Sequence, residues 1–204
     1  MSYVLSFRRP KRISELPNFE GRYYNKNPGV RWAPFIPFFN GPINYLEIGV
    51  SDGGNAIHIA NSYCKHTDSK IYCVDPWMDY DGYSEYRGEQ QKGWLTFNKN
   101  IRNSGHFEKF VIKRGLSENI VPTFENDFFD LIFVDGNHET EYVYADGKMA
   151  FDKVKSGGYI VFDDYDNTWT QTMKGIDMFL NEYASKIKIV FHHDYFYQMI
   201  IQKL

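Results

Sequence analysis

A strand, a helix and a second strand follow one another late in the chain, and this unit restricts the fold more than any other feature. Residues 131–134 and residues 159–162 are two continuously apolar runs. The first run ends at Asp135 and the second at Asp163-Asp164, and the apolar residues between the runs recur at helical spacing. Two strands joined by a crossover helix lie parallel in one sheet. The unit therefore predicts an α/β protein.

The same alternation of strands and helices extends over most of the chain. Three earlier strands are predicted at 43–50, 71–74 and 110–112. The C-terminal runs 187–191 and 196–201 predict an antiparallel hairpin. Together these elements predict a doubly wound, mostly parallel seven-stranded sheet of the Rossmann-like kind, with the hairpin at one edge. Ligands of such sheets bind at the carboxyl ends of the parallel strands.

The composition changes once along the chain, near Gly41-Pro42. Residues 1–42 are rich in aromatic residues and prolines, and we interpret them as an N-terminal appendage that serves as a lid or an oligomer contact. Residues 43–204 form the main domain. An aromatic appendage that covers a second subunit makes a homodimer an expectation, while flat aromatic rings also suit the faces of a sugar.

The charge balance and the cysteine content exclude several classes of protein. Lys and Arg number 23 against 26 Asp and Glu, so no strongly basic surface for nucleic acid is expected. With only 2 Cys in 204 residues, a disulfide scaffold is excluded. No apolar stretch has the length of a membrane span or of a signal peptide, so we expect a cytoplasmic protein with no membrane partner.

The first candidate site is the turn after the first strand. Gly49 and Gly53 flank Ser51 there, and glycines allow the backbone to approach a ligand closely. The spacing differs from the Gly-x-Gly-x-x-Gly fingerprint of dinucleotide binders. The next strand ends at Asp75, whose carboxylate can accept hydrogen bonds from both hydroxyls of a ribose. The alternative is structural, since glycine turns join many strands to helices and Asp-Pro often ends a strand.

The second candidate site is the group of acids after the two late strands. The carboxyl ends of adjacent parallel strands lie roughly 5 Å apart, so Asp135, Asp163 and Asp164 are expected to converge. Carboxylates at close range raise one another's pKa unless a cation neutralises them. Oxygen ligands without cysteine indicate Mg²⁺, with Mn²⁺ or Ca²⁺ as substitutes. Alternatively, one acid caps a helix and another faces solvent.

The glycine turn and the residues after it resemble the motifs of class I S-adenosylmethionine-dependent methyltransferases. The matching segments are residues 46–53 (Leu-Glu-Ile-Gly-Val-Ser-Asp-Gly) and residues 114–118 (Arg-Gly-Leu-Ser-Glu), and the resemblance covers residues 43–204. It implies S-adenosylmethionine as cofactor, with its methionine part against the turn, its ribose at the acid of the second strand and its adenine near 116–117. The implied cofactor-binding residues are Glu47, Gly49, Ser51, Gly53, Asp75, Trp77, Leu116 and Ser117.

Residues 132–136 and 157–165 are similar to the magnesium-dependent sugar O-methyltransferases of the macrolide-antibiotic type. That resemblance implies Asp135, Asp163 and Asp164 as metal ligands. The chain departs from these enzymes at residues 137–140 (Asn-His-Glu-Thr), which are closer to related methyltransferases with a histidine at this place. The general base therefore stays open between Asp135 and His138, whose ordinary pKa suits proton transfer.

These features together predict a divalent-metal-assisted O-methyltransferase that uses S-adenosylmethionine. The expected acceptor is a hydroxyl of a sugar, a glycan or a glycosylated small molecule, because two adjacent hydroxyls can chelate a metal ion. A catechol-like phenol has the same geometry and stays open as the acceptor. A binding module that kept the fold without catalysis is the second alternative.

Overall fold

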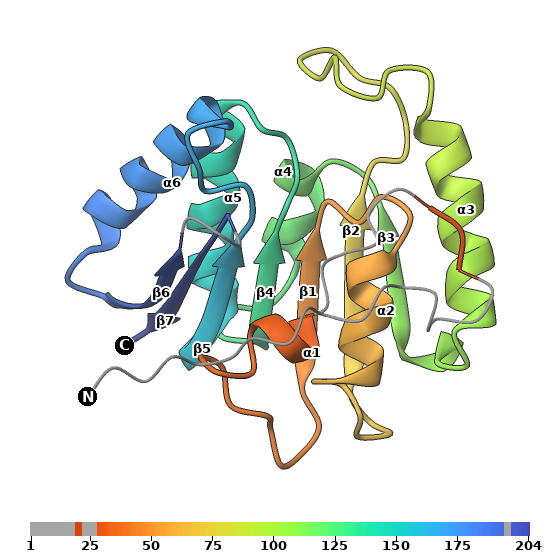
Figure 1. Ribbon diagram of the computed structural model, residues 1–204, viewed down its shortest axis with the longest axis horizontal. Helices are drawn as coiled ribbons and strands as arrows, with labels where there is room; N and C mark the ends of the chain where they lie inside the picture. The colour runs from red at the N-terminus through yellow and green to blue at the C-terminus, as the bar shows by residue number, and fades with distance from the viewer. Residues whose placement is uncertain (1–18, 22–27, 194–196) are drawn as a thin grey trace, which may run out of the picture.

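The computed structural model describes residues 19–21, 28–193 and 197–204, which contain one seven-stranded sheet with helices on both faces (Figure 1). The strand order is β3-β2-β1-β4-β5-β7-β6; β1 to β5 are parallel, and β7 is antiparallel to both of its neighbours. The predicted fold class is confirmed. The strands are β1 (Asn44–Ile48), β2 (Lys70–Asp75), β3 (Phe110–Arg114), β4 (Phe129–Val134), β5 (Val154–Phe162), β6 (Ile187–His193) and β7 (Gln198–Lys203).

Two layers of helices cover the sheet, and Figure 1 shows α2 in front of it with α5 and α6 behind. The helices that come before β3 in the chain pack with one hydrophobic cluster. The helices that come after β3 pack with the other. The first layer contains α1 (Pro28–Arg31), α2 (Gly54–Asn61) and α3 (Gln90–Asn103). The second contains α4 (Ser117–Ile120), α5 (Thr140–Lys153) and α6 (Thr170–Tyr183), and the short turns are η2 (Phe107–Lys109) and η3 (Val121–Thr123).

The central strands are buried on both faces, which explains their continuous apolar sequences. In β4, Leu131 and Phe133 belong to the cluster under α2, whereas Ile132 and Val134 belong to the cluster under α5. Successive side chains of a strand point to opposite faces, so one apolar run supplies both cores. The same alternation places Glu47 of β1 on the α2 face, although it is charged and only 1% exposed.

Backbone hydrogen bonds continue across the sheet just past the strand ends. Gly49 N–H donates to Val74 O at 2.9 Å, Asp135 N–H to Ile48 O at 2.8 Å, and Asp163 N–H to Val134 O at 3.1 Å. These bonds keep the residues that follow β1, β4 and β5 level with one another. The sequence-predicted site residues are therefore brought to one edge of the sheet.

The C-terminal hairpin is present, with a detail that the pattern does not reveal. β7 inserts between β5 and β6, so the last strand of the chain lies inside the sheet and β6 lies at the edge. His192 and His193, which follow the predicted strand 187–191, belong to β6, and residues 194–196 lie outside the described residues. A long-range tertiary pairing thus extends β6 beyond the predicted strand.

The described part of the N-terminal appendage packs onto the domain. Trp32 and Ile36 are 1% and 0% exposed and belong to the cluster on the α2 face. The Trp32 indole N–H donates to Gln198 Oε1 at 2.8 Å, which links the appendage to β7. Residues 1–18 and 22–27 of the appendage lie outside the described residues, and its role as a lid or an oligomer contact stays a prediction. Among the described helices, none combines the length and the apolar composition that crossing a membrane requires.

Candidate active site

Gly49 is required because another part of the backbone occupies the place of a side chain. Its φ is +81°, and a Cβ there would lie 1.9 Å from the carbonyl oxygen of Asp135. Because the colliding atom belongs to the backbone, no change of side-chain rotamer could make room for a Cβ at this position. The absence of a Cβ at Gly49 therefore allows the segment after β4 to cross directly over the end of β1.

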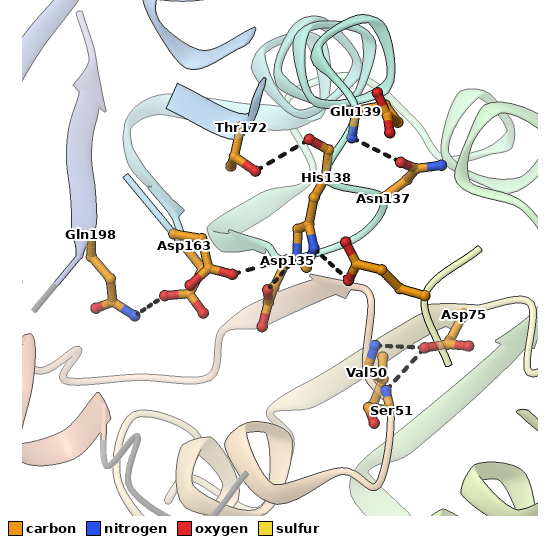
Figure 2. A network of polar contacts seen from close by, with 12 residues as sticks. Val50, Ser51, Asp75, Asp135, Asn137, His138, Glu139, Asp163, Thr172 and Gln198 are labelled. Atoms are coloured by element: carbon orange, nitrogen blue, oxygen red, sulfur yellow. Dashed lines mark hydrogen bonds and ion pairs between the residues drawn. The ribbon is translucent and has the colours of Figure 1, made fainter. Parts of the chain in front are cut away.

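Asp75 holds the glycine turn in place through its carboxylate. Asp75 Oδ2 accepts the N–H groups of Val50 and Ser51 at 2.9 Å each, and Oδ1 accepts that of Trp77 at 2.7 Å. Figure 2 shows the two bonds to the turn. Burial raises the pKa of Asp75, and the three N–H donors partly offset this effect. Asp75 lines the main cavity, so it can both shape the turn and contact a ribose.

Trp77 closes the floor of the turn from the side of α3. It is 1% exposed, its indole N–H donates to Ser51 O at 2.8 Å, and its ring stacks on Phe97 at 4.6 Å between centroids. Gly53 is placed differently from the other predicted cofactor residues, since it is absent from the lining of the cavity. A Cβ on Gly53 would meet the Phe97 ring at 2.7 Å, so this glycine serves the packing of α3.

Glu47 belongs to a buried polar group beneath the turn. Glu47 Oε2 accepts the hydroxyl of Tyr45 at 2.6 Å and the amide N–H of Asn55 at 2.9 Å. Glu47 and Asn55 both line the cavity, and Asn55 Oδ1 is buried with no hydrogen-bond partner among the described residues. A buried acceptor of this kind is satisfied when a ligand with donor groups enters the cavity.

Leu116 and Ser117 lie where β3 passes into α4, and both line the cavity. A residue that sequence reasoning missed, Asp146 of α5, lines the same part and is 3% exposed. Ser117 donates a side-chain hydrogen bond to Asp146. The signal in the sequence was an acid on the buried face of a helix, three residues after Val143 and four before Ala150.

The acids after β4 and β5 gather around His138. Its Nε2 lies 3.7 Å from Asp135 Oδ1 and 3.4 Å from Asp164 Oδ2, and its Nδ1 lies 3.0 Å from Glu85 Oε2. One ligand atom each from Asp135, His138 and Asp164 fit within 4.8 Å of one another. Oxygen and nitrogen atoms at this separation can share one cation.

Asp163, a predicted metal ligand, is placed differently from Asp135 and Asp164. It is 2% exposed, and its Oδ1 accepts the side-chain amide of Gln198 at 3.0 Å (Figure 2). It contributes no atom to the group that could share a cation, and it does not line the main cavity. Consecutive residues after a strand diverge, and the φ of +54° at Asp164 turns the chain there. Among the described residues, the ligand atoms close enough to share one cation come from Asp135, His138 and Asp164, and Asp163 as a ligand stays a prediction.

The surroundings of His138 change its protonation. Burial alone would lower its pKa, but the carboxylates of Asp135, Glu85 and Asp164 raise the pKa to about 9. Without a bound cation the imidazole is therefore charged at neutral pH. Thr172 donates to the His138 carbonyl at 3.3 Å, and the ring lies 4.6 Å from that of Trp169. These contacts hold the imidazole in one orientation.

The long segment 76–89 lies against the turn that carries His138. The amide N–H groups of Asn137 donate to Gly82 O at 3.2 Å and to the Tyr80 hydroxyl at 3.3 Å. Tyr80 stacks on Tyr83 at 5.5 Å between centroids. Glu85, which lies in the same segment, is the second site residue that sequence reasoning missed. A loop has no periodic pattern that predicts which of its side chains reach the site.

A single cavity of about 600 Å³ joins the two candidate sites. The glycine turn, Asp75 and Ser117 line one part, and Asp135, His138 and Asp164 line another. This volume is within the range of sites for small organic ligands. Aromatic side chains complete the lining, namely Trp77, Tyr80, Tyr83, Tyr86, Tyr142 and Trp169.

Comparison with known proteins gives a family match and a sequence relative. Residues 46–165 match the model of a family described as methyltransferase domain. The chain is 27% identical over 179 residues to an uncharacterised protein, R132, of Acanthamoeba polyphaga mimivirus, and the match covers 86% of this chain and 76% of that protein.

Solved structures share the fold at low sequence identity. The O-methyltransferase TomG of Streptomyces achromogenes, involved in tomaymycin synthesis and solved with S-adenosylmethionine, has a TM-score of 0.60 at 15% identity, over 78% of this chain and 72% of that one. A Clostridium thermocellum protein described as a candidate rRNA methylase has a TM-score of 0.61 at 12% identity, over 82% and 91% of the two chains. At these identities the likeness concerns the fold alone.

Proposed function

The chain belongs to the methyltransferase domain family, and from this premise we propose that it is an S-adenosylmethionine-dependent O-methyltransferase assisted by a divalent metal ion. The observation that carries the proposal is the shared cavity, which the glycine turn and the group around His138 both line. A methyl donor and an acceptor hydroxyl must meet within one enclosed volume for direct transfer.

The volume and the polar lining of the cavity support the proposed cofactor. Gly49 and Ser51 bring the backbone to its wall, Asp75 offers carboxylate oxygens to ribose hydroxyls, and Leu116 with Ser117 borders the adenine end. The buried acceptors of Glu47 and Asn55 suit the ammonium end of a methionine. S-Adenosylmethionine bound here supplies a methyl group on a good leaving group.

The group around His138 fits a divalent cation. Asp135 and Asp164 offer the oxygen ligands that Mg²⁺, Mn²⁺ and Ca²⁺ prefer, and the His138 nitrogen adds one that Mn²⁺ also accepts. A cation bound there lowers the pKa of a coordinated hydroxyl. Neutralisation of the clustered carboxylates by such an ion would also stabilise this end of the cavity.

Different residues of the chain bind the donor, cover the acceptor and take up the proton. Asp75 and the turn hold the donor, and segment 76–89 with Trp169 covers the acceptor side and limits the access of water. Asp135 takes the proton from the hydroxyl of the acceptor. His138 either ligates the metal ion or orients the acceptor. In a metal-free alternative, His138 is the base, and it must first lose the proton that its pKa of about 9 retains.

The proposed acceptor is a vicinal diol of a sugar, a glycan or a glycosylated small molecule. Tyr80, Tyr83 and Trp169 support this assignment, because aromatic faces pack on the C–H faces of sugars. The same rings can stack on a catechol, which is the second candidate acceptor. A cytoplasmic location, a homodimer and the absence of nucleic-acid and membrane partners remain part of the proposal.

Calorimetry with S-adenosylhomocysteine tests the cofactor assignment, with binding in the micromolar range expected and no binding contradicting it. Methyl transfer from labelled S-adenosylmethionine is then measured on sugars with vicinal diols and on catechol. Each assay is run after chelation and again after Mg²⁺ or Mn²⁺ is restored. Loss and recovery of activity supports metal assistance, whereas full activity in excess chelator removes it from the mechanism.

The pH profile separates the two candidate bases. With metal present, proton transfer to Asp135 predicts activity that is already high near neutral pH. If His138 acts as a metal-free base, the rate in chelator should rise with pH up to about 9. A flat profile in chelator, with activity intact, would contradict His138 as the base.

A further inference from the structure

Asp146 is a buried acid that the proposed methyl transfer does not use. It lies on α5, is 3% exposed and lines the cavity beside Ser117. Among the residues that the structure describes, no Lys, Arg or His forms an ion pair with it. The charge of Glu118 acts on Asp146 and repels its ionised form. A carboxyl group in this position costs stability and therefore calls for a reason.

The packing around Asp146 aims its carboxyl group toward the space between the segments that follow β3 and β4. A Cβ built on Gly136 would lie 3.0 Å from Asp146 Oδ2, so the carboxylate reaches the backbone just after Asp135. On the other side it accepts the Ser117 hydroxyl. Gly136, Ser117 and Asp146 all line the cavity, and together they make one polar corner of it.

Within the described part of the chain, the Asp146 carboxylate keeps hydrogen-bond acceptor positions to spare. A carboxylate has about four acceptor positions, and Ser117 occupies one of them. Burial raises the pKa of Asp146 to about 7, with the Ser117 bond acting against this and Glu118 adding to it. At pH values above that point the group is mostly an ionised acceptor, for which a ligand with an N–H donor is the matching partner.

We propose that Asp146 accepts a hydrogen bond from the exocyclic amino group of the cofactor's adenine ring and so selects adenine over hypoxanthine. This inference rests on the proposed function, because it assumes that the adenine occupies the Leu116 and Ser117 end of the cavity. Adenine presents an N–H donor at that position, whereas hypoxanthine presents a carbonyl oxygen. A buried carboxylate therefore attracts the first base and repels the second.

The experiment compares S-adenosylhomocysteine with S-inosylhomocysteine, in which oxygen replaces the amino group. Calorimetry on the full-length protein at about pH 8 keeps Asp146 mostly ionised. We expect S-adenosylhomocysteine to bind at least about tenfold more tightly. Equal affinity for the two ligands would overturn the inference while leaving the proposed function intact, and failure to bind either would overturn both.

The Asp146→Asn variant assigns the selectivity to this residue. An amide can turn its carbonyl toward adenine or its N–H₂ toward hypoxanthine, so the affinity ratio should fall to within about threefold. Asp146→Ser has a hydroxyl that can donate or accept, so it should reduce the affinity ratio in the same way. This second variant tests the assignment if Asp146→Asn does not fold. A ratio unchanged from wild type in a folded variant would overturn the assignment.

Asp152→Asn is the matched control. Asp152 lies on the same helix α5, is exposed and does not line the cavity, and the substitution removes the same charge. Its affinity ratio should equal that of the wild type. A reduced ratio in this control would show that general electrostatics, and not contact with Asp146, produces the selectivity.

Discussion

The two ends of the cavity are built in opposite ways. At the glycine turn, the carboxylate of Asp75 is surrounded by backbone N–H donors, and Gly49 allows two backbone segments to cross. At the other end, the carboxylates of Asp135, Glu85 and Asp164 surround the imidazole of His138. The first end is held by hydrogen bonds to the backbone, and the second by charges on side chains.

This difference separates the residues that shape the cavity from those that carry charge in it. Hydrogen bonds to backbone N–H groups are short and directional, so they fix the position of the backbone that donates them. Charged side chains respond to bound cations and to protons. Substitutions at the glycine turn should therefore disturb folding or cofactor binding, and substitutions around His138 should disturb catalysis while the fold remains.

Gly49→Ala should have the largest effect, because the backbone at Gly49 packs directly against the backbone of Asp135 and so joins the two ends of the cavity. The added Cβ would lie 1.9 Å from the Asp135 carbonyl oxygen, at a φ of +81° that alanine rarely adopts. We expect a loss of about 3 kcal/mol or more in the free energy of unfolding, measured by urea titration, together with loss of methyl transfer. Gly41→Ala is the control, since a Cβ on Gly41 meets nothing within 4 Å. Near-wild-type stability of Gly49→Ala would show that the crossing can be relieved.

Asp164→Asn should remove activity while sparing the cofactor end. The φ of +54° at this position suits asparagine, so the backbone is kept while one ligand charge is lost. We expect at least about a 100-fold fall in kcat/KM with S-adenosylhomocysteine affinity unchanged.

Asp163→Asn is the companion variant, because Asp163 bonds to Gln198 and gives no ligand atom to the group around His138. Its kcat/KM should fall much less. An equal loss in both variants would return Asp163 to the ligand set, and a weakened cofactor affinity in Asp164→Asn would contradict the separation of the two ends.

Asp75→Asn should show the complementary effect. In the wild type, each oxygen of Asp75 accepts a hydrogen bond from at least one backbone N–H group. Whichever way the amide of the variant turns, its N–H₂ therefore faces a backbone N–H donor, and that hydrogen bond is lost. Calorimetry should give an affinity for S-adenosylhomocysteine about tenfold weaker, with Mn²⁺ binding measured by the same method unchanged. Loss of Mn²⁺ binding with retained cofactor affinity would reverse the roles that we assign to the two ends.

The smallest effect is expected from the pH dependence of stability at Asp146. Its pKa of about 7 in the folded protein lies above the ordinary value of 3.8, so the folded protein holds a proton that the unfolded chain releases. This group therefore stabilises the fold less as the pH rises from about 4 to about 7. The Tm of Asp146→Asn relative to wild type should increase by a few degrees between about pH 5 and pH 8. A constant Tm difference would show that the carboxyl does not titrate in this range.

The fold and half of the site follow from local patterns in the sequence. Continuous apolar strands, each ending at a glycine or an acid, predicted the parallel sheet and directed attention to Gly49, Asp75 and Asp135. The same reasoning placed His138 near the acids. The predicted fold is confirmed, and the predicted site residues gather at one edge because the strand ends of a parallel sheet meet there whatever the details of packing.

Tertiary structure alone decided which side chains face the cavity. Asp163 and Asp164 are neighbours in sequence, yet one bonds to Gln198 of β7 and the other approaches His138. Glu85 comes from a loop without periodicity, and Asp146 comes from the buried face of α5, the helix that follows β4. A residue type indicates what a side chain can bind, but its direction depends on backbone angles and on packing partners distant in the sequence.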